Sequence, residues 1–263
     1  MNILIMAAAR KGVEDSVAKM QDKSHKCLVE IGGEVMLVQV IHSCLDCGHD
    51  AQIYISIESE EPLRTVPQLS QWLDEKVIQV VPSHGNLADS VLAAVEHMET
   101  PFPLVITTGD NVLHHGQIVG DFITQFKAGR SDIAVAFTEA QSVNREAPDV
   151  QLAYHRLKDG AFSACNLYGL RSENALKAIR IFEGGGQFGK RHLRILKAFG
   201  IMPFVYYKLR LLGLQDLMRK IGANLGVTVD TLILDYPEGP IDVDNPQFFA
   251  IAERMLRLRA EQS

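Results

Sequence analysis

Two residues in the first half of the chain have the type and position to act on phosphate groups. Lys26 lies between a polar stretch and the strand-like residues 27–31, and a Gly-Gly turn and a helix start follow it. Asp110 stands two residues beyond the apolar run 104–108. A lysine can neutralise charge growing on phosphate oxygens, and a carboxylate at the end of a buried strand can hold Mg²⁺ against them. The alternatives are a solvated surface lysine and a turn aspartate that caps the next element.

A second acidic site lies near the C-terminus, where Asp242 and Asp244 follow a Pro-Glu-Gly-Pro turn. Alternation through Val243 points both carboxylates to one side. The alternative is N-capping of the last helix, which Asp244 or Asn245 could provide. Asp242 is too far upstream to be that cap, so it ranks slightly above Asp244 as a metal ligand.

A loop of small residues follows the first apolar run, residues 2–6. It reads Ala7-Ala8-Ala9-Arg10-Lys11-Gly12. Small side chains let backbone N–H groups approach phosphate oxygens closely. The loop is neither a Walker A loop nor G-x-G-x-x-G, and alanine-rich strand–loop junctions without a ligand are common in α/β proteins.

A further candidate is the junction between a predicted strand at 77–81 and a predicted helix at 88–98. Helix N-termini favour anionic and polar ligands, so this junction is a candidate binding segment. Its alternative is a loop with ordinary capping. The residues concerned are Gly85, Asn86, Asp89 and Ser90.

Alternating elements are needed to position these residues. Strands are predicted at 2–6, 53–57, 77–81, 104–108 and 133–137, and helices at 35–47, 64–74, 88–98 and 116–127. This order predicts βαβ units and an α/β fold with a mainly parallel sheet and helices on both faces. In such sheets ligands bind beyond the carboxyl ends of the strands.

The regular alternation weakens after residue 137. We expect strands at 150–154 and 161–170 joined by a turn at 158–160, then a helix at 172–182, a strand at 228–235 and a helix from 247. Between Glu183 and Lys220 there are eight Lys or Arg and two acidic residues, interleaved with aromatic and aliphatic side chains. We interpret residues 183–226 as a helical insertion within a single domain, residues 1–263.

The composition is typical of a soluble globular protein, with 263 residues, 47% of them hydrophobic and 22% charged. A net charge of −6 argues against a protein that binds nucleic acid over its whole surface, and we expect no nucleic-acid partner. We expect no signal peptide and no transmembrane segment, because the first apolar run is short and no run of about 18 apolar residues exists. Cys44 and Cys47 form a single C-x-x-C, for which buried helix positions are favoured over a metal or redox site. A reducing, cytoplasmic location is expected.

Together these segments resemble the MobA-like nucleotidyltransferase family, which is related to cytidylyltransferases and sugar-phosphate nucleotidyltransferases. The resemblance covers residues 1–182 and 227–258 and rests on the order and spacing of its motifs. They are Met6–Gly12, His25–Leu28, Gly33–Leu37, Ala88–Val91, Thr108–Asp110, Cys165–Gly169 and Ile241–Pro246. The chain departs from the family where the loop has lost glycines and where His25 replaces a proline.

The resemblance implies a Rossmann-like fold of the GT-A type and transfer of NMP from an NTP, most readily CTP or GTP, to a phosphorylated small-molecule acceptor. Lys26 and Asp110 would be catalytic, and Mg²⁺ would bind Asp110, Asp242 and Asp244. Asn166 and Tyr168 would face the acceptor. The implied nucleotide-binding residues are Ala7, Ala8, Ala9, Arg10, Lys11, Gly12, Lys26, Gly85, Asn86, Asp89, Ser90, Thr108 and Gly109.

The basic insertion leaves two interpretations open. One is a lipid-linked acceptor with peripheral contact to a membrane surface. The other, which is favoured, is a packed helical subdomain or the contact of a homodimer.

Two other functions compete with nucleotidyl transfer. A GT-A glycosyltransferase would need a D-x-D motif at the central strand edge, where this chain has Gly109-Asp110-Asn111. A nucleotide-binding module without catalysis would fit the altered loop, but the retained Lys26, Asp110 and Asp242 argue against it.

Overall fold

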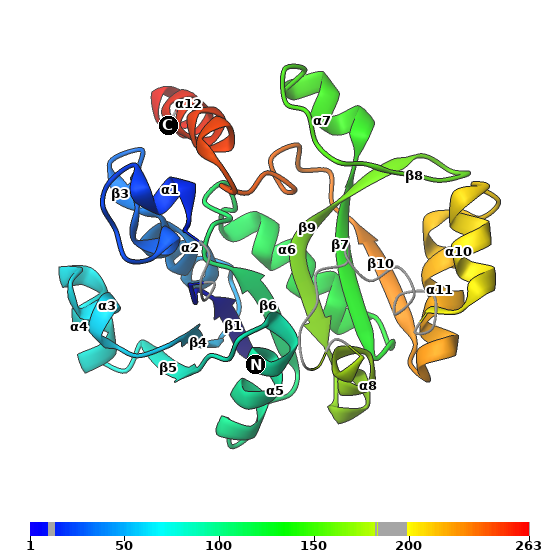
Figure 1. The fold of residues 1–263 in the computed structure, drawn as a ribbon, viewed down its shortest axis with the longest axis horizontal. Helices are drawn as coiled ribbons and strands as arrows, with labels where there is room; N and C mark the ends of the chain where they lie inside the picture. Colours follow the sequence, from blue (N-terminus) through cyan, green and yellow to red (C-terminus); the bar gives the residue numbers. More distant parts are fainter. Residues whose placement is uncertain (10–13, 182, 184–198, 263) are drawn as a thin grey trace.

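An eight-stranded mixed sheet runs through the centre of the molecule, in the order β10-β7-β9-β6-β1-β4-β5 with β8 paired to β9 (Figure 1). The computed structural model describes residues 1–9, 14–181, 183 and 199–262. The strands are β1 (Asn2–Met6), β4 (Gln52–Ile57), β5 (Ile78–Pro82), β6 (Leu104–Thr108), β7 (Ile133–Glu139), β8 (His155–Arg156), β9 (Ala161–Leu170) and β10 (Val229–Ile233).

Most neighbouring strands are parallel, as the alternation of elements predicts. β1 pairs in parallel with β4 and β6, β4 with β5, and β7 with β10. β9 is antiparallel to both β6 and β7, so it enters the middle of the sheet in the opposite direction. The carboxyl end of β6 therefore lies beside the middle of β9.

Helices pack on both faces because side chains alternate along the strands. Ile3 and Ile5 of β1 join a core with α2 (Met36–Leu45) and α6 (Gly116–Ala128). Leu4 joins the core on the opposite face. The helices of that second face are α5 (Leu87–His97), α8 (Leu176–Arg180) and α11 (Leu214–Leu225).

A third core holds the two ends of the chain together. It contains Val17, Val29, Val112, Ile241 and Val243. These come from α1 (Ser16–Lys19), the hairpin of β2 (Glu30–Ile31) and β3 (Glu34–Val35), the loop after β6, and the segment before α12 (Pro246–Gln262). Figure 1 shows α12, in red, beside the blue α1 and β3. The N-terminal lysine segment and the C-terminal acidic segment thus share one packed unit.

Two predictions in the first third of the chain are corrected. Residues 27–31 are not one strand: a 3₁₀ helix, η1 (Lys26–Leu28), precedes the two-residue β2, because the backbone closes a turn from Val29 N–H to the Lys26 carbonyl at 3.0 Å. The predicted helix 64–74 is two helices, α3 (Glu61–Arg64) and α4 (Pro67–Asp74). Pro67 disfavours helical backbone at the residue before it, and Val66 is extended.

The predicted strand 150–154 is also wrong. The turn at 158–160 forms, with the Leu157 N–H donating to the Gly160 carbonyl at 2.7 Å. That turn sets the register, so His155 and Arg156 pair with β9. Val150 packs into the third core instead of extending the strand.

The remaining helices lie around the edges of the sheet. They are α7 (Ala140–Glu146), η2 (Glu173–Ala175) and α10 (Ile201–Lys208), which lies with α11 within the predicted insertion. α11 packs against β10 and buries Leu214 and Leu217. Residues 184–198 of the predicted insertion lie outside the described residues.

Candidate metal and nucleotide site

Lys26 is held by a short, well-anchored element at the carboxyl end of β1. The next residue, Cys27, is buried, and its Sγ donates to the Ala7 carbonyl at 3.4 Å. On the other side, Asp15 caps α1 by accepting two backbone N–H groups. The backbone that carries Lys26 is therefore fixed against the end of β1, and the side chain extends from it.

The Lys26 ammonium lies between two carboxylates. Its Nζ is 2.5 Å from Asp110 Oδ2 and 2.8 Å from Asp244 Oδ1. Burial alone would lower the pKa of Lys26, but the charges and hydrogen bonds of the two carboxylates outweigh it and raise the pKa above its ordinary value. Lys26 is thus a permanent cation in the site.

Asp110 lies in the turn that directly follows β6. Thr108 Oγ1 donates to Asp110 Oδ1 at 2.5 Å, and the Asn111 amide donates to the same Thr108 hydroxyl oxygen at 2.5 Å. A Cβ on Gly109 would lie 3.2 Å from the Cβ of Cys27. A side chain at Gly109 would therefore press on the Lys26 element, so the absence of one brings the two segments together.

Asp242 is fixed between two fully buried neighbours, Ile241 and Val243. The Val243 N–H donates to the Asp110 carbonyl at 3.1 Å, which joins the two acidic segments through their backbones. Burial, and then the charges of Asp110 and Asp244, raise the pKa of Asp242 to about 6. Ionising the Asp242 carboxyl group in the folded protein therefore costs free energy.

Asp244 does not cap the last helix. Asn245 does so, because its Oδ1 accepts from the backbone N–H groups of Gln247 and Phe248 at 3.0 and 3.1 Å. Asp244 is exposed and directs its carboxylate to Lys26. The two capping alternatives raised by the sequence are thus resolved in favour of Asn245.

The turn before Asp242 is tied to its surroundings by ionic and hydrogen bonds. Burial lowers the pKa of His114 to about 4, and the neutral ring donates from Nε2 to the Gly239 carbonyl at 2.8 Å. Glu238 pairs with Arg259 of α12 at 3.1 Å and with His115 at 3.4 Å. These contacts fix the path of the acidic segment.

Asp110, Asp242 and Asp244 together offer a donor set for a divalent cation. One carboxylate oxygen from each residue lies within 4.8 Å of the others. Hard oxygen ligands of this kind suit Mg²⁺, which binds through one or two carboxylates together with substrate phosphates. The residues present therefore fit the metal that the sequence implies.

The described part of the alanine loop begins beside this group. The Ala7 N–H donates to the Ser56 carbonyl at 3.0 Å, so Ala7 continues the register of β1. Ala8 is half-buried and Ala9 is exposed. The predicted contacts at Arg10, Lys11 and Gly12 lie outside the described residues.

The start of α5 has its polar side chains bonded locally. Asn86 caps the helix, accepting from the Asp89 N–H at 3.0 Å, and its amide donates to the Asp89 carboxylate. The Ser90 hydroxyl accepts from the His84 N–H at 2.8 Å and donates to the Asn86 carbonyl at 2.9 Å. Both side chains therefore hold the loop itself, while Gly85 has open space around its Cα.

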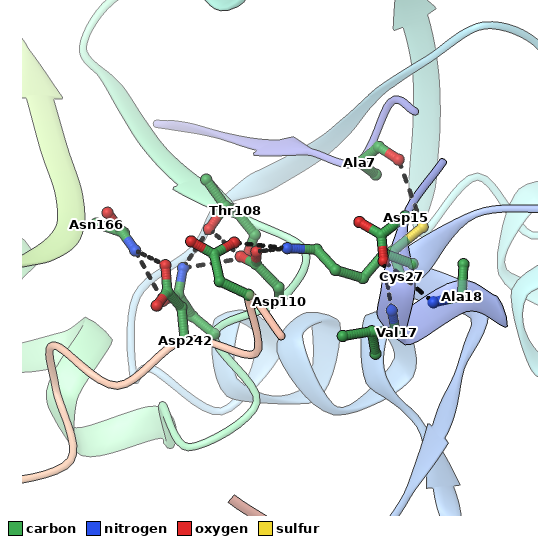
Figure 2. A network of polar contacts seen from close by, with 12 residues as sticks. Ala7, Asp15, Val17, Ala18, Cys27, Thr108, Asp110, Asn166 and Asp242 are labelled. Atoms are coloured by element: carbon green, nitrogen blue, oxygen red, sulfur yellow. Dashed lines mark hydrogen bonds and ion pairs between the residues drawn. The ribbon is translucent and has the colours of Figure 1, made fainter. Parts of the chain in front are cut away.

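The two residues predicted to face the acceptor differ in position. Asn166 reaches the acidic group, with its Nδ2 3.1 Å from Asp242 Oδ2. Tyr168 packs against the core of the α5 face, and burial raises the pKa of its phenol. Asn166 is thus part of the polar network in Figure 2. Tyr168 packs against the adjoining apolar cluster.

Sequence reasoning missed one member of this network, Asn111. It is fully buried, donates to Thr108 and accepts from Asn166 Nδ2 at 3.2 Å. Its place directly after Asp110 at the end of a buried strand was the available signal. Its burial depends on β9 and the acidic segment, which lie far away in the sequence.

Cys44 and Cys47 show the packing favoured from the sequence. Both are buried and free, and burial raises the pKa of the Cys44 thiol to about 12. Within the described residues, the acidic trio is the group of His, Cys, Asp or Glu side chains with metal-binding spacing.

The chain belongs to the MobA-like NTP transferase domain family, whose sequence model matches residues 18–216. This confirms the resemblance and supports nucleotidyl transfer as the general class of reaction. A comparison with curated proteins found no match.

Solved structures share the fold over almost the whole chain. A hypothetical transferase from Thermus thermophilus is 21% identical, with a TM-score of 0.74 over 94% of this chain and 98% of that one. CMP:2-keto-3-deoxy-manno-octonic acid synthetase complexed with CTP is 14% identical, with a TM-score of 0.59 over 100% and 99%. 4-Diphosphocytidyl-2C-methyl-D-erythritol synthase from Anaerococcus prevotii is 9% identical, with a TM-score of 0.57 over 97% of each chain. At these identities the likeness shows the fold alone, which is Rossmann-like.

In the parts of the chain that the structure describes, no helix combines the length and the apolar character needed to cross a membrane.

Proposed function

We propose that this protein transfers an NMP group from an NTP, CTP or GTP, to a phosphorylated small-molecule acceptor and releases pyrophosphate. The observation that carries the proposal is the meeting of Lys26 with Asp110, Asp242 and Asp244 at the carboxyl end of β6. Membership of the NTP transferase family supports the same class of reaction. The four free, buried cysteines support a reducing location such as the cytoplasm.

The reaction needs positioning and charge stabilisation more than covalent chemistry. A phosphate oxygen of the acceptor attacks the α-phosphorus of the NTP, and the bond from that phosphorus to the β-phosphate oxygen breaks. Mg²⁺ bound by Asp110 and Asp242, with Asp244 nearby, would offset the charge on the phosphate oxygens. Lys26 stays protonated and moves its ammonium from the carboxylates to the oxygens of the α-phosphate.

The nucleotide would lie across the ends of β1 and β6. Backbone N–H groups from Ala8 to Gly12, including Arg10 and Lys11, are proposed to hold the β- and γ-phosphates, and Ala7, whose own N–H is bonded to Ser56, would start this loop. Thr108 and Gly109 would line the floor under the α-phosphate. The segment Gly85 to Ser90 would meet base and ribose mainly through its backbone, because the Asn86 and Ser90 side chains are bonded within the loop.

The acceptor would approach from the side of β9. Asn166 reaches the acidic group from that strand, and Tyr168 lies two residues further along it. We propose that both line the acceptor side of the site.

The surface at α10 supports one version of this proposal, in which the phosphorylated acceptor is linked to a lipid. Ile201, Met202, Leu209 and Leu211 are exposed apolar side chains, and Lys208 Nζ lies 5.7 Å from the centre of the Phe204 ring. Apolar and cationic side chains at one surface suit an anionic membrane. Flotation with anionic vesicles tests this contact, and light scattering tests the alternative, a homodimer through the same surface.

The decisive experiment measures pyrophosphate release with each of the four NTPs and Mg²⁺ against a pool of phosphorylated sugars and alcohols. Asp110→Asn is the negative control, and Asp216→Asn on the exposed face of α11 is a matched carboxylate change outside the site. Release that depends on one NTP, one acceptor and Asp110 supports the proposal.

Two outcomes would overturn it. Release of a nucleoside diphosphate from a nucleotide sugar would identify a glycosyltransferase instead. Nucleotide binding by calorimetry without turnover, across an acceptor pool that includes lipid-linked phosphates, would identify a binding module.

A further inference from the structure

We propose that Asn166 is a positioning residue for Asp242, holding that carboxylate ready for a divalent cation, and that the buried side chain of Asn111 supports its amide. This inference rests on the proposed function, because it assigns a second role to a residue on the acceptor side of the same site. The argument starts from the backbone that places Asn166.

The strand β9 is distorted at Asn166. Val135 of β7 pairs with Tyr168, and Phe137 pairs with Ala164, so a step of two residues on β7 faces a step of four on β9. The extra residues form a bulge, and Asn166 lies at its centre with a φ of +52°. Bulges re-aim side chains and are common beside active sites, and asparagine is among the non-glycine residues that best tolerate the left-handed region.

Buried neighbours hold the bulge in this shape. Cys165 and Leu167, on either side of Asn166, are both fully buried in the core of the α2 and α6 face. Thr138 Oγ1 lies 3.2 Å from Cys165 Sγ and donates to the Leu234 carbonyl at 2.9 Å. The backbone therefore cannot move Asn166 outward without exposing two apolar side chains.

The amide of Asn166 is directed at two acceptors inside the site. Its Nδ2 is 3.1 Å from Asp242 Oδ2 and 3.2 Å from Asn111 Oδ1. Asn111 is itself fixed, because it is fully buried and donates to Thr108. The Asn166 amide group thus has two acceptors, and its bond to Asn111 keeps it directed at Asp242.

Asp242 is equally constrained on its own side. Ile241 and Val243 are fully buried, and the backbone of Val243 is bonded to Asp110. The contact between Asn166 and Asp242 therefore joins two fixed backbones rather than two mobile side chains. Such outer contacts orient metal-binding carboxylates, and their loss typically weakens metal affinity about 10- to 100-fold.

The test uses Mn²⁺ alone, with no nucleotide, and measures its affinity for the full chain by electron paramagnetic resonance. Asn166→Gly removes the amide and keeps a residue that accepts a positive φ. We expect about 10- to 100-fold weaker Mn²⁺ binding, with the metal-free protein still folded by circular dichroism. Asn111→Ala removes the brace on Asn166 together with the hydrogen bond to Thr108, and it should also weaken Mn²⁺ binding.

The matched control is Asn174→Ala. Asn174 Nδ2 donates to Asp132 Oδ1 at 2.9 Å, an amide–carboxylate bond before the start of β7 and away from the site. That variant should bind Mn²⁺ as the unmodified protein does. Equal Mn²⁺ affinity in Asn166→Gly and the unmodified protein would overturn the proposal, and a raised KM for the acceptor alone would reassign Asn166 to acceptor binding.

This result is separable from the proposed function. Mn²⁺ binding that depends on Asn166 supports the positioning role even where no pyrophosphate is released. An unmodified protein that binds no Mn²⁺ at millimolar concentration would overturn the positioning role and the metal assignment together.

Discussion

The carboxyl end of β6 and the N-terminus of α5 contain similar polar residues but use them differently. At the end of β6, Asp110 directs its carboxylate across to Lys26, a residue 84 positions away. At the start of α5, Asn86 and Ser90 bond within their own loop, to partners at most six positions away. Both segments follow a strand, and both were predicted to bind the nucleotide.

The difference helps to distinguish side chains that are placed to bind a ligand from side chains that only stabilise their own loop. Local hydrogen bonds satisfy a loop and leave its side chains little to offer a ligand. Like charges brought together from distant segments have no such use in folding, since they repel one another. The cluster at β6 is therefore the part of the molecule that a bound cation would stabilise most.

The largest effect is expected at Asp110. Asp110→Asn keeps the size of the side chain and removes a charge that would hold the metal. We expect pyrophosphate release to fall by more than about 10³-fold. Steady-state kinetics check this, with Asp216→Asn as the matched change. Activity within tenfold of the unmodified enzyme would contradict the comparison.

Lys26→Met should have a slightly smaller effect on rate and an opposite effect on metal binding. The rate should fall by about 10²- to 10³-fold, equivalent to about 2.7–4 kcal/mol. Mn²⁺ affinity should rise, because no ammonium competes for Asp110 and Asp244. Lys220→Met on α11 is the control, and a loss of Mn²⁺ affinity in Lys26→Met would argue against competition.

Asp242 links stability to pH. Its pKa is raised in the folded state to about 6, above its ordinary value of 3.8. The folded protein thus holds this proton more tightly than the unfolded chain does, and the associated stability is lost as pH rises through about 6.

Asp242→Asn should therefore stabilise the metal-free protein at pH 7.5, by on the order of 1–2 kcal/mol after allowance for solvent screening, and have little effect at pH 4. Thermal unfolding at the two pH values checks this. In the unmodified protein, Mg²⁺ affinity should fall as pH drops below about 6. If Asp242→Asn and the unmodified protein differ in stability by the same amount at both pH values, ionisation of Asp242 is not the cause of the difference.

The smallest effects on activity are expected at the start of α5. Ser90→Ala removes a hydroxyl that joins His84 to Asn86, so it should lower the free energy of unfolding by about 1 kcal/mol. The KM for nucleotide should change by no more than about threefold if the segment binds through its backbone. Chemical denaturation and NTP titration measure the two quantities. A large rise in KM with unchanged stability would make Ser90 a direct nucleotide contact.

Much of the fold could be predicted because its signals are local. The predicted strands at 2–6 and 104–108 have the bounds of β1 and β6, because each is a short apolar run. The errors arose where distant contacts decide the structure. Val150 has the pattern of a strand residue but packs against the third core, and the turn at 158–160 leaves it outside the hairpin.

The site could be predicted in its residue types but not in its connections. Asp110, Asp242 and Lys26 have recognisable positions after strands and turns. The sequence could not reveal that Asn111 is fully buried, nor that the bulge in β9 turns Asn166 towards Asp242. Both depend on where an antiparallel strand enters a parallel sheet.

The ion pair between Lys26 and Asp244 joins residues 218 positions apart. Synthesis proceeds from the N-terminus, so the lysine and its supporting hairpin leave the ribosome long before the acidic segment and α12. Until then the hairpin lacks Ile241, Val243 and Phe249, which complete the third core around it. A chain synthesised only as far as β10 therefore lacks both Asp242 and Asp244 and the packing that completes the third core around the lysine hairpin.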